Sequence, residues 1–169
     1  MRVLGLDPRL RHTGWGVIDV DGNRLSHVAD VVAAARIDLS FGERLVSLFR
    51  QIGEVVERFR HDAAAVEETF VNKNPVSTLR LGAARGVVLL APAERGVPVA
   101  EHAAKMIKKS GVDAGHAEKT QVQLMVRRLL PGCGVVKADA ADALAVAICH
   151  AHRAGTMNAW QAVAGRLGR

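Results

Sequence analysis

The first part of the chain alternates short apolar runs with turn-forming residues. Residues 2–6 (RVLGL) form an apolar run that ends at Asp7, while residues 15–20 (WGVIDV) and 24–32 (RLSHVADVV) flank an Asp-Gly pair at 21–22. Short apolar runs bounded by turn residues are typical of strands, and two of them around Asp-Gly predict a β-hairpin. We therefore expect three antiparallel strands at the start of the protein.

Helical periodicity dominates the remainder of the chain. Four stretches carry apolar residues at helical spacing, namely 43–60, 75–92, 117–130 and 139–152. Two short apolar runs between these helices predict further strands at 63–67 and 97–100. This order of elements predicts an α/β domain with a mixed five-stranded sheet, three antiparallel strands followed by parallel ones, flanked by helices.

Length and composition indicate a single soluble domain. The chain has 169 residues, of which 49% are apolar and 24% charged, which suits one domain with a sizeable core. The N-terminus meets a charge at Asp7, unlike a signal peptide, and no apolar run approaches the ~18 residues of a membrane span. We expect a cytoplasmic protein without a membrane segment, comprising a domain of residues 1–155 and a weakly patterned tail of residues 156–169.

The two cysteines, Cys133 and Cys149, lack the spacing of a metal-binding motif, and we expect both to be reduced thiols. Cys149 lies next to His150 and close to His152, which leaves a zinc site open as one interpretation. The other interpretation, which we favour, is that the two histidines are solvated or cap the end of a helix.

The charge balance points to a polyanionic partner. The formal net charge is +6 at pH 7 and the sequence pI is about 10.0. Lys and Arg bind phosphates largely through charge, so a basic protein of this kind suits nucleic acid. Many basic proteins are merely soluble, and the charge becomes informative only when acidic residues cluster within basic surroundings.

Four acidic residues occupy positions where chemistry is expected in an α/β protein. Asp7 and Glu67 each end a predicted strand, and Asp139 and Asp142 stand three apart at the start of the last helix, on one face. Four carboxylates together repel one another, and a bound hard cation resolves this. Mg²⁺ and Mn²⁺ take oxygen ligands, and a pair of such ions supports phosphodiester cleavage.

Each acid also has an ordinary structural interpretation. Asp7 precedes Pro8 and suits a turn, and Glu67 suits a solvated strand end. Asp139 suits an N-cap, and Asp142 suits an exposed acid that favours the helix dipole. Their joint occurrence in these contexts favours the metal site.

Four stretches together resemble the RuvC family of Holliday-junction resolvases: LGLDPRLRHTGWGVI, VEETFVNKNPVSTLRLGAARGVVL, AEKTQVQLMVRRLL and ADAADALAVAICHAH. The resemblance covers about residues 1–155. It implies an RNase H-like fold and Mg²⁺-dependent symmetric nicking of four-way DNA junctions in recombination and repair, with two ions in each active site and Mn²⁺ as a substitute. By position, the family's catalytic and metal-binding acids fall on Asp7, Glu67, Asp139 and Asp142.

The resemblance also implies partners. It predicts a homodimer, because two symmetric nicks need two active sites, and it predicts branch-migration partners of the RuvA and RuvB type. The helix with Leu79, Leu81 and Ala84 is a candidate dimer element, although periodicity does not separate an interface from a core.

Candidate DNA contacts follow from the same resemblance. Phe70 matches an aromatic residue near the junction's crossover, where an apolar side chain is suited to wedging between bases. Lys108 and Lys119 match lysines that contact the scissile region or the backbone. Lys73, Arg80 and Arg85 supply positive charge near Glu67. Arg9 stands where the family usually has glycine, and it adds a positive charge beside Asp7.

Two alternatives remain at this stage. The first is a catalytically silent module that binds four-way junctions, which the four intact acids disfavour. The second is an ATP-binding actin-like domain, because GLDPRLRHTGWG also resembles a strand–turn–strand that cradles phosphates. Proteins of that class need a second lobe, for which 169 residues leave no room.

Overall fold

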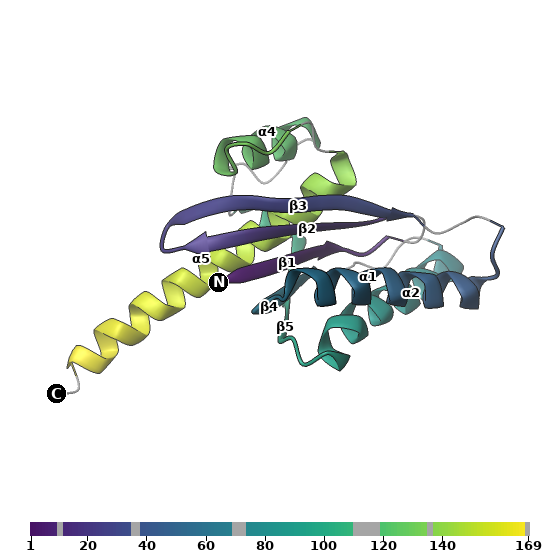
Figure 1. Cartoon of the computed structure of the whole chain (residues 1–169), viewed down its shortest axis with the longest axis horizontal. Coiled ribbons are helices and arrows are strands. Elements are labelled where there is room, and N and C mark those ends of the chain that lie inside the picture. The colour runs from purple at the N-terminus through teal and green to yellow at the C-terminus, as the bar shows by residue number, and fades with distance from the viewer. Residues whose placement is uncertain (10–11, 35–37, 69–73, 110–118, 135–136, 168–169) are drawn as a thin grey trace.

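The computed structural model describes residues 1–9, 12–34, 38–68, 74–109, 119–134 and 137–167, without the side chains of residues 34, 108, 119 and 156–167 (Figure 1). The strands within these ranges are β1 (Arg2–Asp7), β2 (His12–Asp21), β3 (Arg24–Ala34), β4 (Ala63–Glu67) and β5 (Val99–His102). The helices are α1 (Phe41–Phe59), α2 (Pro75–Glu94), α3 (Ala104–Lys109), α4 (Lys119–Leu129) and α5 (Ala138–Leu167).

The strands form one mixed sheet in the order β3-β2-β1-β4-β5. β1, β2 and β3 pair antiparallel, whereas β4 pairs parallel to β1 and β5 parallel to β4. The predicted arrangement of three antiparallel strands followed by parallel ones is therefore confirmed. One consequence matters for function: β1, β4 and β5 all end at the same edge of the sheet.

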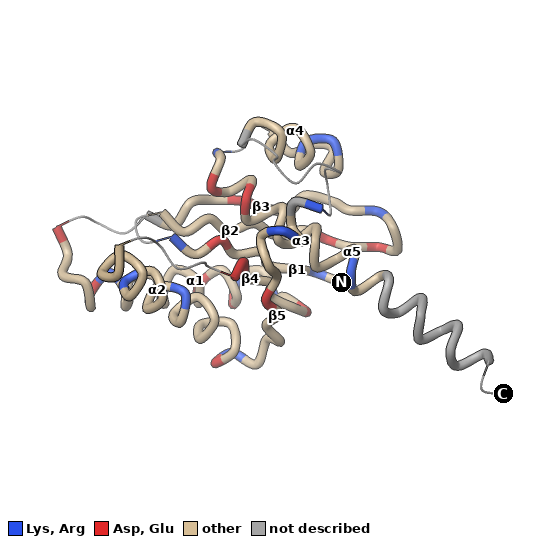
Figure 2. Tube along the Cα trace, turned by 180° about the vertical axis from the view of Figure 1, so that it is seen from behind, with Lys and Arg blue, Asp and Glu red and all other residues tan. Residues whose placement is uncertain are grey.

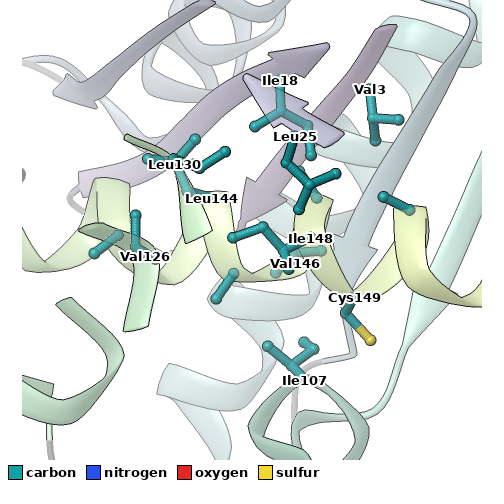
Figure 3. Close-up of a cluster of buried hydrophobic side chains, with 14 of the residues drawn as sticks. Val3, Ile18, Leu25, Ile107, Val126, Leu130, Leu144, Val146, Ile148 and Cys149 are labelled. Carbon is teal, nitrogen blue, oxygen red and sulfur yellow. The ribbon is translucent and has the colours of Figure 1, made fainter. Parts of the chain in front are cut away.

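Helices cover both faces of the sheet (Figure 1). On one face, α1 and α2 pack over apolar residues that include Leu4, Leu6 and Val66. On the other, α4 and α5 pack over a second cluster, in which strand residues such as Val3 and Ile18 meet α5 (Figure 3). The alternating strand residues thus supply two cores, one for each helical layer.

Local sequence signals set the starts of two helices. Ser40 caps α1, with the backbone of Glu43 donating to Oγ of Ser40 and the Glu43 carboxylate accepting from the Ser40 backbone. Asn74 caps α2, where Oδ1 accepts from the backbone N–H of Ser77, and Pro75 takes the first helical position. Both starts lie where the sequence predicts them.

One helix and two element boundaries differ from the sequence-based expectation. The short helix α3 is not predicted, because its AKMIKK sequence carries little helical pattern. The strand expected at 97–100 instead runs from Val99 to His102, where it pairs with β4 out to Glu67. The last helix, expected to end near His152, continues to Leu167. The division into a domain of residues 1–155 and a tail stays a prediction.

Helix α2 is long and apolar enough to cross a membrane by length and composition alone, contrary to the expectation that no stretch approaches such a span. Its Ala84, Val88 and Ala91 are buried against the sheet layer. Only 22% of the apolar stretch is buried within the domain. We interpret α2 as a helix that packs a narrow stripe on the domain core and leaves a wide apolar side exposed.

Candidate active site

The ends of two neighbouring parallel strands carry the first two acids. Asp7 ends β1 and Glu67 ends β4, and the register pairs Leu6 with Val66 just before them. Adjacent strands lie about 4.8 Å apart, so the two acids share one stretch of the sheet edge. The Asp7 side chain is 6% exposed, whereas Glu67 is only partly buried. The edge therefore holds a buried carboxylate next to a more accessible one.

Glycines in β1 and β2 let α5 lie directly on the sheet at this edge. Gly14 pairs with Asp7, and a Cβ on Gly14 would overlap the backbone carbonyl of Asp139. A Cβ on Gly5 would likewise overlap the carbonyl of Ala143 one turn later. Side chains at these two positions would hold the helix away from the sheet. The glycines thus bring the start of α5 to the end of β1.

The close approach places Asp139 and Asp142 beside Asp7. Both aspartates lie in the first turns of α5, which begins at Ala138, so Asp139 is inside the helix rather than its N-cap. Candidate ligand oxygens of the three aspartates all lie within 4.8 Å of one another. The spacing of three residues predicted one helical face for the pair, and this is confirmed.

One guanidinium group contacts all three carboxylates. Arg9 Nε lies 2.7 Å from Asp7 Oδ2, Nη2 lies 2.6 Å from Asp142 Oδ2, and Nη1 lies 3.3 Å from Asp139 Oδ1. The hydroxyl of the buried Thr13 donates to the carbonyl oxygen of Arg9 over 3.1 Å, which ties the loop to β2. Arg9 therefore occupies the centre of the aspartate cluster as a fixed positive charge.

The electrostatics of the cluster follow from burial. Burial raises the pKa of Asp7 to about 6, while Arg9 opposes the rise and the two neighbouring aspartates add to it. Burial lowers the pKa of Arg9, but the three carboxylates more than offset this and the pKa is raised overall. Asp7 is consequently a carboxylate whose ionisation depends on a cation beside it.

The donor set suits a hard divalent cation. All three groups are carboxylates, which Mg²⁺ and Mn²⁺ prefer over nitrogen or sulfur ligands. The Arg9 guanidinium already acts as a stand-in cation among them. Repulsion between closely spaced carboxylates is what a bound metal ion relieves. The residues therefore fit the metal that the sequence predicts.

Comparisons with known proteins identify the family. Residues 3–150 match the family model described as "Crossover junction endodeoxyribonuclease RuvC". The match spans most of the chain, including the ends of β1 and β4 and the start of α5. The chain belongs to the RuvC family.

Two curated relatives with the same description, crossover junction endodeoxyribonuclease RuvC, are similar to this chain over nearly its whole length. The protein of Paramagnetospirillum magneticum is 61% identical over 156 residues, which cover 92% of this chain and 94% of the relative. The protein of Cereibacter sphaeroides is 52% identical over 169 residues, which cover both chains completely.

Solved structures agree with this assignment. The structure of T. thermophilus RuvC in complex with Holliday junction substrate has a TM-score of 0.85 and 35% identity, covering 92% of this chain and 96% of that one. The yeast mitochondrial Holliday junction resolvase Ydc2 has a TM-score of 0.70 at 15% identity, covering 98% and 83%, and shows the fold alone. The predicted RNase H-like α/β fold is confirmed.

Glu67, the remaining acid predicted from the RuvC pattern, is not part of the aspartate cluster. Among the described residues, the group with ligand atoms within 4.8 Å of one another contains Asp7, Asp139 and Asp142 but not Glu67. Glu67 pairs through the backbone with His102 on β5, whose Nε2 lies 3.1 Å from Nδ1 of His150 on α5. The structure thus brings three of the four acids together and leaves the fourth at the adjoining strand end.

The predicted DNA contacts have different outcomes. Phe70 and Lys73 lie outside the described residues, and Lys108 and Lys119 are described only as backbone in α3 and at the start of α4. Arg80 is exposed on α2, with its guanidinium 5.8 Å from the centre of the Phe41 ring. Arg85 forms an ion pair with Glu101 on β5. All six assignments remain predictions.

The three residues of the possible zinc site, Cys149, His150 and His152, lie in different surroundings in the structure. Cys149 is buried in the α5 core cluster, and His150 is partly buried against His102 rather than solvated at a helix end. His152 is exposed, as expected. Burial lowers the pKa of His102 and of His150, with the neighbouring imidazole adding to the effect on His102. The two rings thus form a partly buried pair between β5 and α5, and the pKa of each is lowered.

Sequence reasoning missed two features of the site. It recognised Arg9 as a charge beside Asp7, but not that the same side chain would reach Asp139 and Asp142 from the other end of the chain. It also passed over Gly14 and Gly5, although glycine inside a predicted strand often signals close approach of another backbone. That signal was present in RVLGL and HTGWG.

Proposed function

We propose that the protein is a structure-selective endonuclease that resolves Holliday junctions by symmetric, metal-dependent nicking, acting in homologous recombination and DNA repair. The observation that carries the proposal is the convergence of Asp7, Asp139 and Asp142 at the end of β1, next to the strand that ends in Glu67. The names of its relatives, and the junction complex formed by the T. thermophilus protein, support the same substrate.

Asp7, Glu67, Asp139 and Asp142 would hold Mg²⁺, with two ions as the expected number and Mn²⁺ as a substitute. Such ions supply Lewis-acid stabilisation of phosphoryl oxygens and an activated water. The chain itself supplies the positioning: β1 fixes Asp7 in a buried place, and the glycine-lined packing of α5 fixes Asp139 and Asp142 opposite it. The carboxylates of such a preorganised cage need little rearrangement of their own to bind a cation once Arg9 has moved aside.

Arg9 has two roles in this proposal. Without a divalent cation, its guanidinium neutralises the three aspartates and holds them together. The same oxygens cannot serve a metal ion and Arg9 at once, so this pairing lowers the affinity of the cage for the metal. Arg9 follows Asp7 by two residues, so its side chain remains near the site when a metal ion displaces it from the carboxylates. There it is suited to pairing with a DNA phosphate.

The remaining positive charge suits DNA binding. The formal net charge is +6 although acids gather at the sheet edge. Figure 2 shows basic positions along α2, α3 and α4 and acidic positions beside β4. Lys73, Arg80, Arg85, Lys108 and Lys119 are the proposed basic contacts and Phe70 the proposed wedge between bases. Phosphate contacts of this kind make binding strongly salt-dependent.

A homodimer follows from the need for two nicks, and α2 offers a face for it. Val76, Leu79 and Leu90 recur at helical spacing and are 57%, 76% and 56% exposed. Leu81 is only partly exposed, and Ala84 is buried in the core, which leaves Leu79 as the strongest of the three residues suggested by the sequence. A second copy of this chain is the proposed occupant of this apolar face.

The cellular setting is proposed from the family. RuvA- and RuvB-type branch-migration proteins are the expected partners of the dimer on the junction. A protein that acts on chromosomal junctions in bacteria is expected in the cytoplasm. The family match favours a nuclease over an ATP-binding actin-like domain.

The alternative of a silent junction-binding module is separated from a resolvase by one comparison. A synthetic four-way junction is incubated with the protein in Mg²⁺ or in chelator, and binding and nicking are measured on the same samples. The proposal predicts binding in both conditions and paired nicks at equivalent positions only with Mg²⁺. Binding without nicks under any divalent cation would instead identify the silent module.

A further inference from the structure

A break in the pairing of β2 and β3 changes which way the β3 side chains point. Val17 pairs with Ala29 but the next residue, Ile18, pairs with His27, so Val28 is an extra residue on β3. Such a bulge shifts the alternation of side chains by one position. Val28 and Ala29 accordingly both pack on the α1–α2 side of the sheet, although they are adjacent in sequence.

The same bulge places His27 and Asp30 together on the other face of the sheet. Residues three apart on a regular strand point to opposite faces, but here both lie on the same side. His27 Nε2 is 2.7 Å from Asp30 Oδ1, and the two side chains are 21% and 20% exposed. The bulge therefore brings an imidazole and a carboxylate together on the face covered by α4 and α5.

The turn after α4 adds a thiol to this pair. Gly132 has a φ of 92°, a left-handed conformation that suits glycine, and the backbone N–H of Cys133 donates to Leu130 O over 3.1 Å. Cys133 is a free, partly buried cysteine that packs against the α5 core cluster. Ligand atoms of His27, Asp30 and Cys133 all lie within 4.8 Å of one another.

These three residue types form a recognisable ligand set. Zinc binds Cys, His and Asp in tetrahedral sites, at about 2.0–2.3 Å, which places the ligand atoms roughly 3.3–3.8 Å apart. Small side-chain adjustments bring the three groups from their present separations to that geometry. The partial exposure of His27 and Asp30 leaves room for a water as the fourth ligand.

We propose that His27, Asp30 and Cys133 form a second metal site, which binds a zinc-class divalent cation and is separate from the aspartate cluster. A thiolate and an imidazole select zinc or cobalt over Mg²⁺, which prefers oxygen ligands. Neutral His27, ionised Asp30 and a Cys133 thiolate balance the charge of one divalent ion. The site would join β3 to the turn after α4, across the core between the sheet and that helix.

The Cys133 thiol must lose its proton to bind a metal ion. Burial and the Asp30 carboxylate raise the pKa of Cys133, whereas Arg127 on α4 lowers it. The thiol is thus protonated in the metal-free protein, and binding of the metal releases that proton.

Cobalt tests the proposal directly, because Co²⁺ bound to a thiolate gives an intense near-ultraviolet charge-transfer band that carboxylate ligands do not give. The full-length protein, freed of metal with chelator and kept reduced, is titrated with Co²⁺. We expect a thiolate band that saturates at one Co²⁺ per chain and disappears when Zn²⁺ is added.

Four variants locate the site. Cys133→Ser is expected to abolish the band, and His27→Gln to weaken Co²⁺ binding more than about tenfold. Cys149→Ala removes the other cysteine of the chain and is expected to keep the band. Asp7→Asn is also expected to keep it, so the result is independent of the nuclease site. Far-ultraviolet circular dichroism checks that each variant is folded.

Two outcomes would overturn the proposal. One is a folded, reduced wild-type protein that gives no thiolate band at millimolar Co²⁺. The other is a band that survives in Cys133→Ser or is lost in Cys149→Ala. If Cys133→Ser does not fold, the wild-type and Cys149→Ala titrations still decide whether Cys133 is the ligand.

Discussion

Arg9 Nη2 lies 2.6 Å from Asp142 Oδ2, across 133 residues of sequence. The same guanidinium also reaches Asp7 and Asp139, so a positive charge built into the loop after β1 neutralises the aspartate cluster. This relationship gives the three aspartates a neutralising charge that comes from the chain itself. In the proposed metal site, cation affinity would therefore depend on a residue that is not a proposed ligand.

The Arg9→Gln variant tests that dependence. Removing the guanidinium leaves three carboxylates in mutual repulsion, so the metal-free protein is expected to lose about 1–2 kcal/mol of stability, a value discounted because the Arg9 side chain is 38% exposed. Without its competitor, Mg²⁺ should bind about five- to thirtyfold more tightly. Thermal unfolding in chelator and calorimetric titration with Mg²⁺ measure the two effects.

The matched control is Arg95→Gln, which removes an arginine that pairs with Glu57 and Glu94 away from the site. It should change thermal stability slightly and leave Mg²⁺ affinity unaltered. An unchanged or weaker Mg²⁺ affinity in Arg9→Gln would show that Arg9 does not compete with the metal.

The Gly14→Ala variant tests how α5 is placed. The added Cβ would overlap the carbonyl of Asp139, so the helix must move away from β2, at an expected cost of about 1–3 kcal/mol. Mg²⁺ affinity should fall as well, because Asp139 and Asp142 move with the helix. Chemical denaturation and calorimetry measure both quantities. Gly42→Ala in α1, where a Cβ meets nothing within 4 Å, should be neutral or slightly stabilising.

Protonation of His61, which lies outside the active site, should lower the stability of the folded protein in acid. Burial lowers its pKa to about 4, from an ordinary value of 6.5 in the unfolded chain. The unfolded state therefore binds more protons between these values, and His61 costs up to about 3 kcal/mol of stability as the pH falls from 6.5 to 4. Above pH 6.5 the histidine has no such effect.

The His61→Leu variant checks the sign of this effect. The difference in unfolding free energy between variant and wild type should shift in favour of the variant as the pH falls from 7.5 to 4.5. Urea denaturation at several pH values measures it. A difference that stays constant over this range would mean that His61 is protonated equally in the folded and unfolded states.

The exposed face of α2 predicts the oligomeric state. Leu79 is 76% exposed, and Leu79→Glu should convert a dimer to a monomer by placing a charge in the interface. Light scattering coupled to gel filtration measures the mass. Leu124→Glu on α4, where the leucine is 63% exposed, is the control and should leave the dimer intact. A wild-type protein with the mass of one chain would contradict the proposed dimer.

Local sequence patterns were sufficient to predict where much of the candidate site lies in the fold. Asp7 and Glu67 each follow an apolar run, and a strand that ends in a carboxylate places it at the sheet edge. The spacing of Asp139 and Asp142 put both on one side of a helix. These inferences needed only the periodicity of neighbouring residues, together with a resemblance that identified the family.

Relationships between distant segments could not be predicted in this way. The contacts of Arg9 with Asp139 and Asp142 depend on how closely α5 packs on the sheet, which in turn depends on the glycines of β1 and β2. The proximity of His27 and Asp30 depends on a bulge in β3 that no local sequence pattern predicted. The pairing of Arg85 with Glu101 depends on a register shifted from the predicted strand.

The most direct test of the proposed function is the effect of Asp142→Asn on a synthetic four-way junction. The substitution keeps the size of the side chain but removes the charge of a proposed metal ligand. With Mg²⁺, nicking should fall more than about 100-fold while junction binding is retained. Asp21→Asn in the β2–β3 turn, where Asn-Gly also favours a hairpin, should nick like the wild type. Asp142→Asn nicking at the wild-type rate would contradict the proposed metal site.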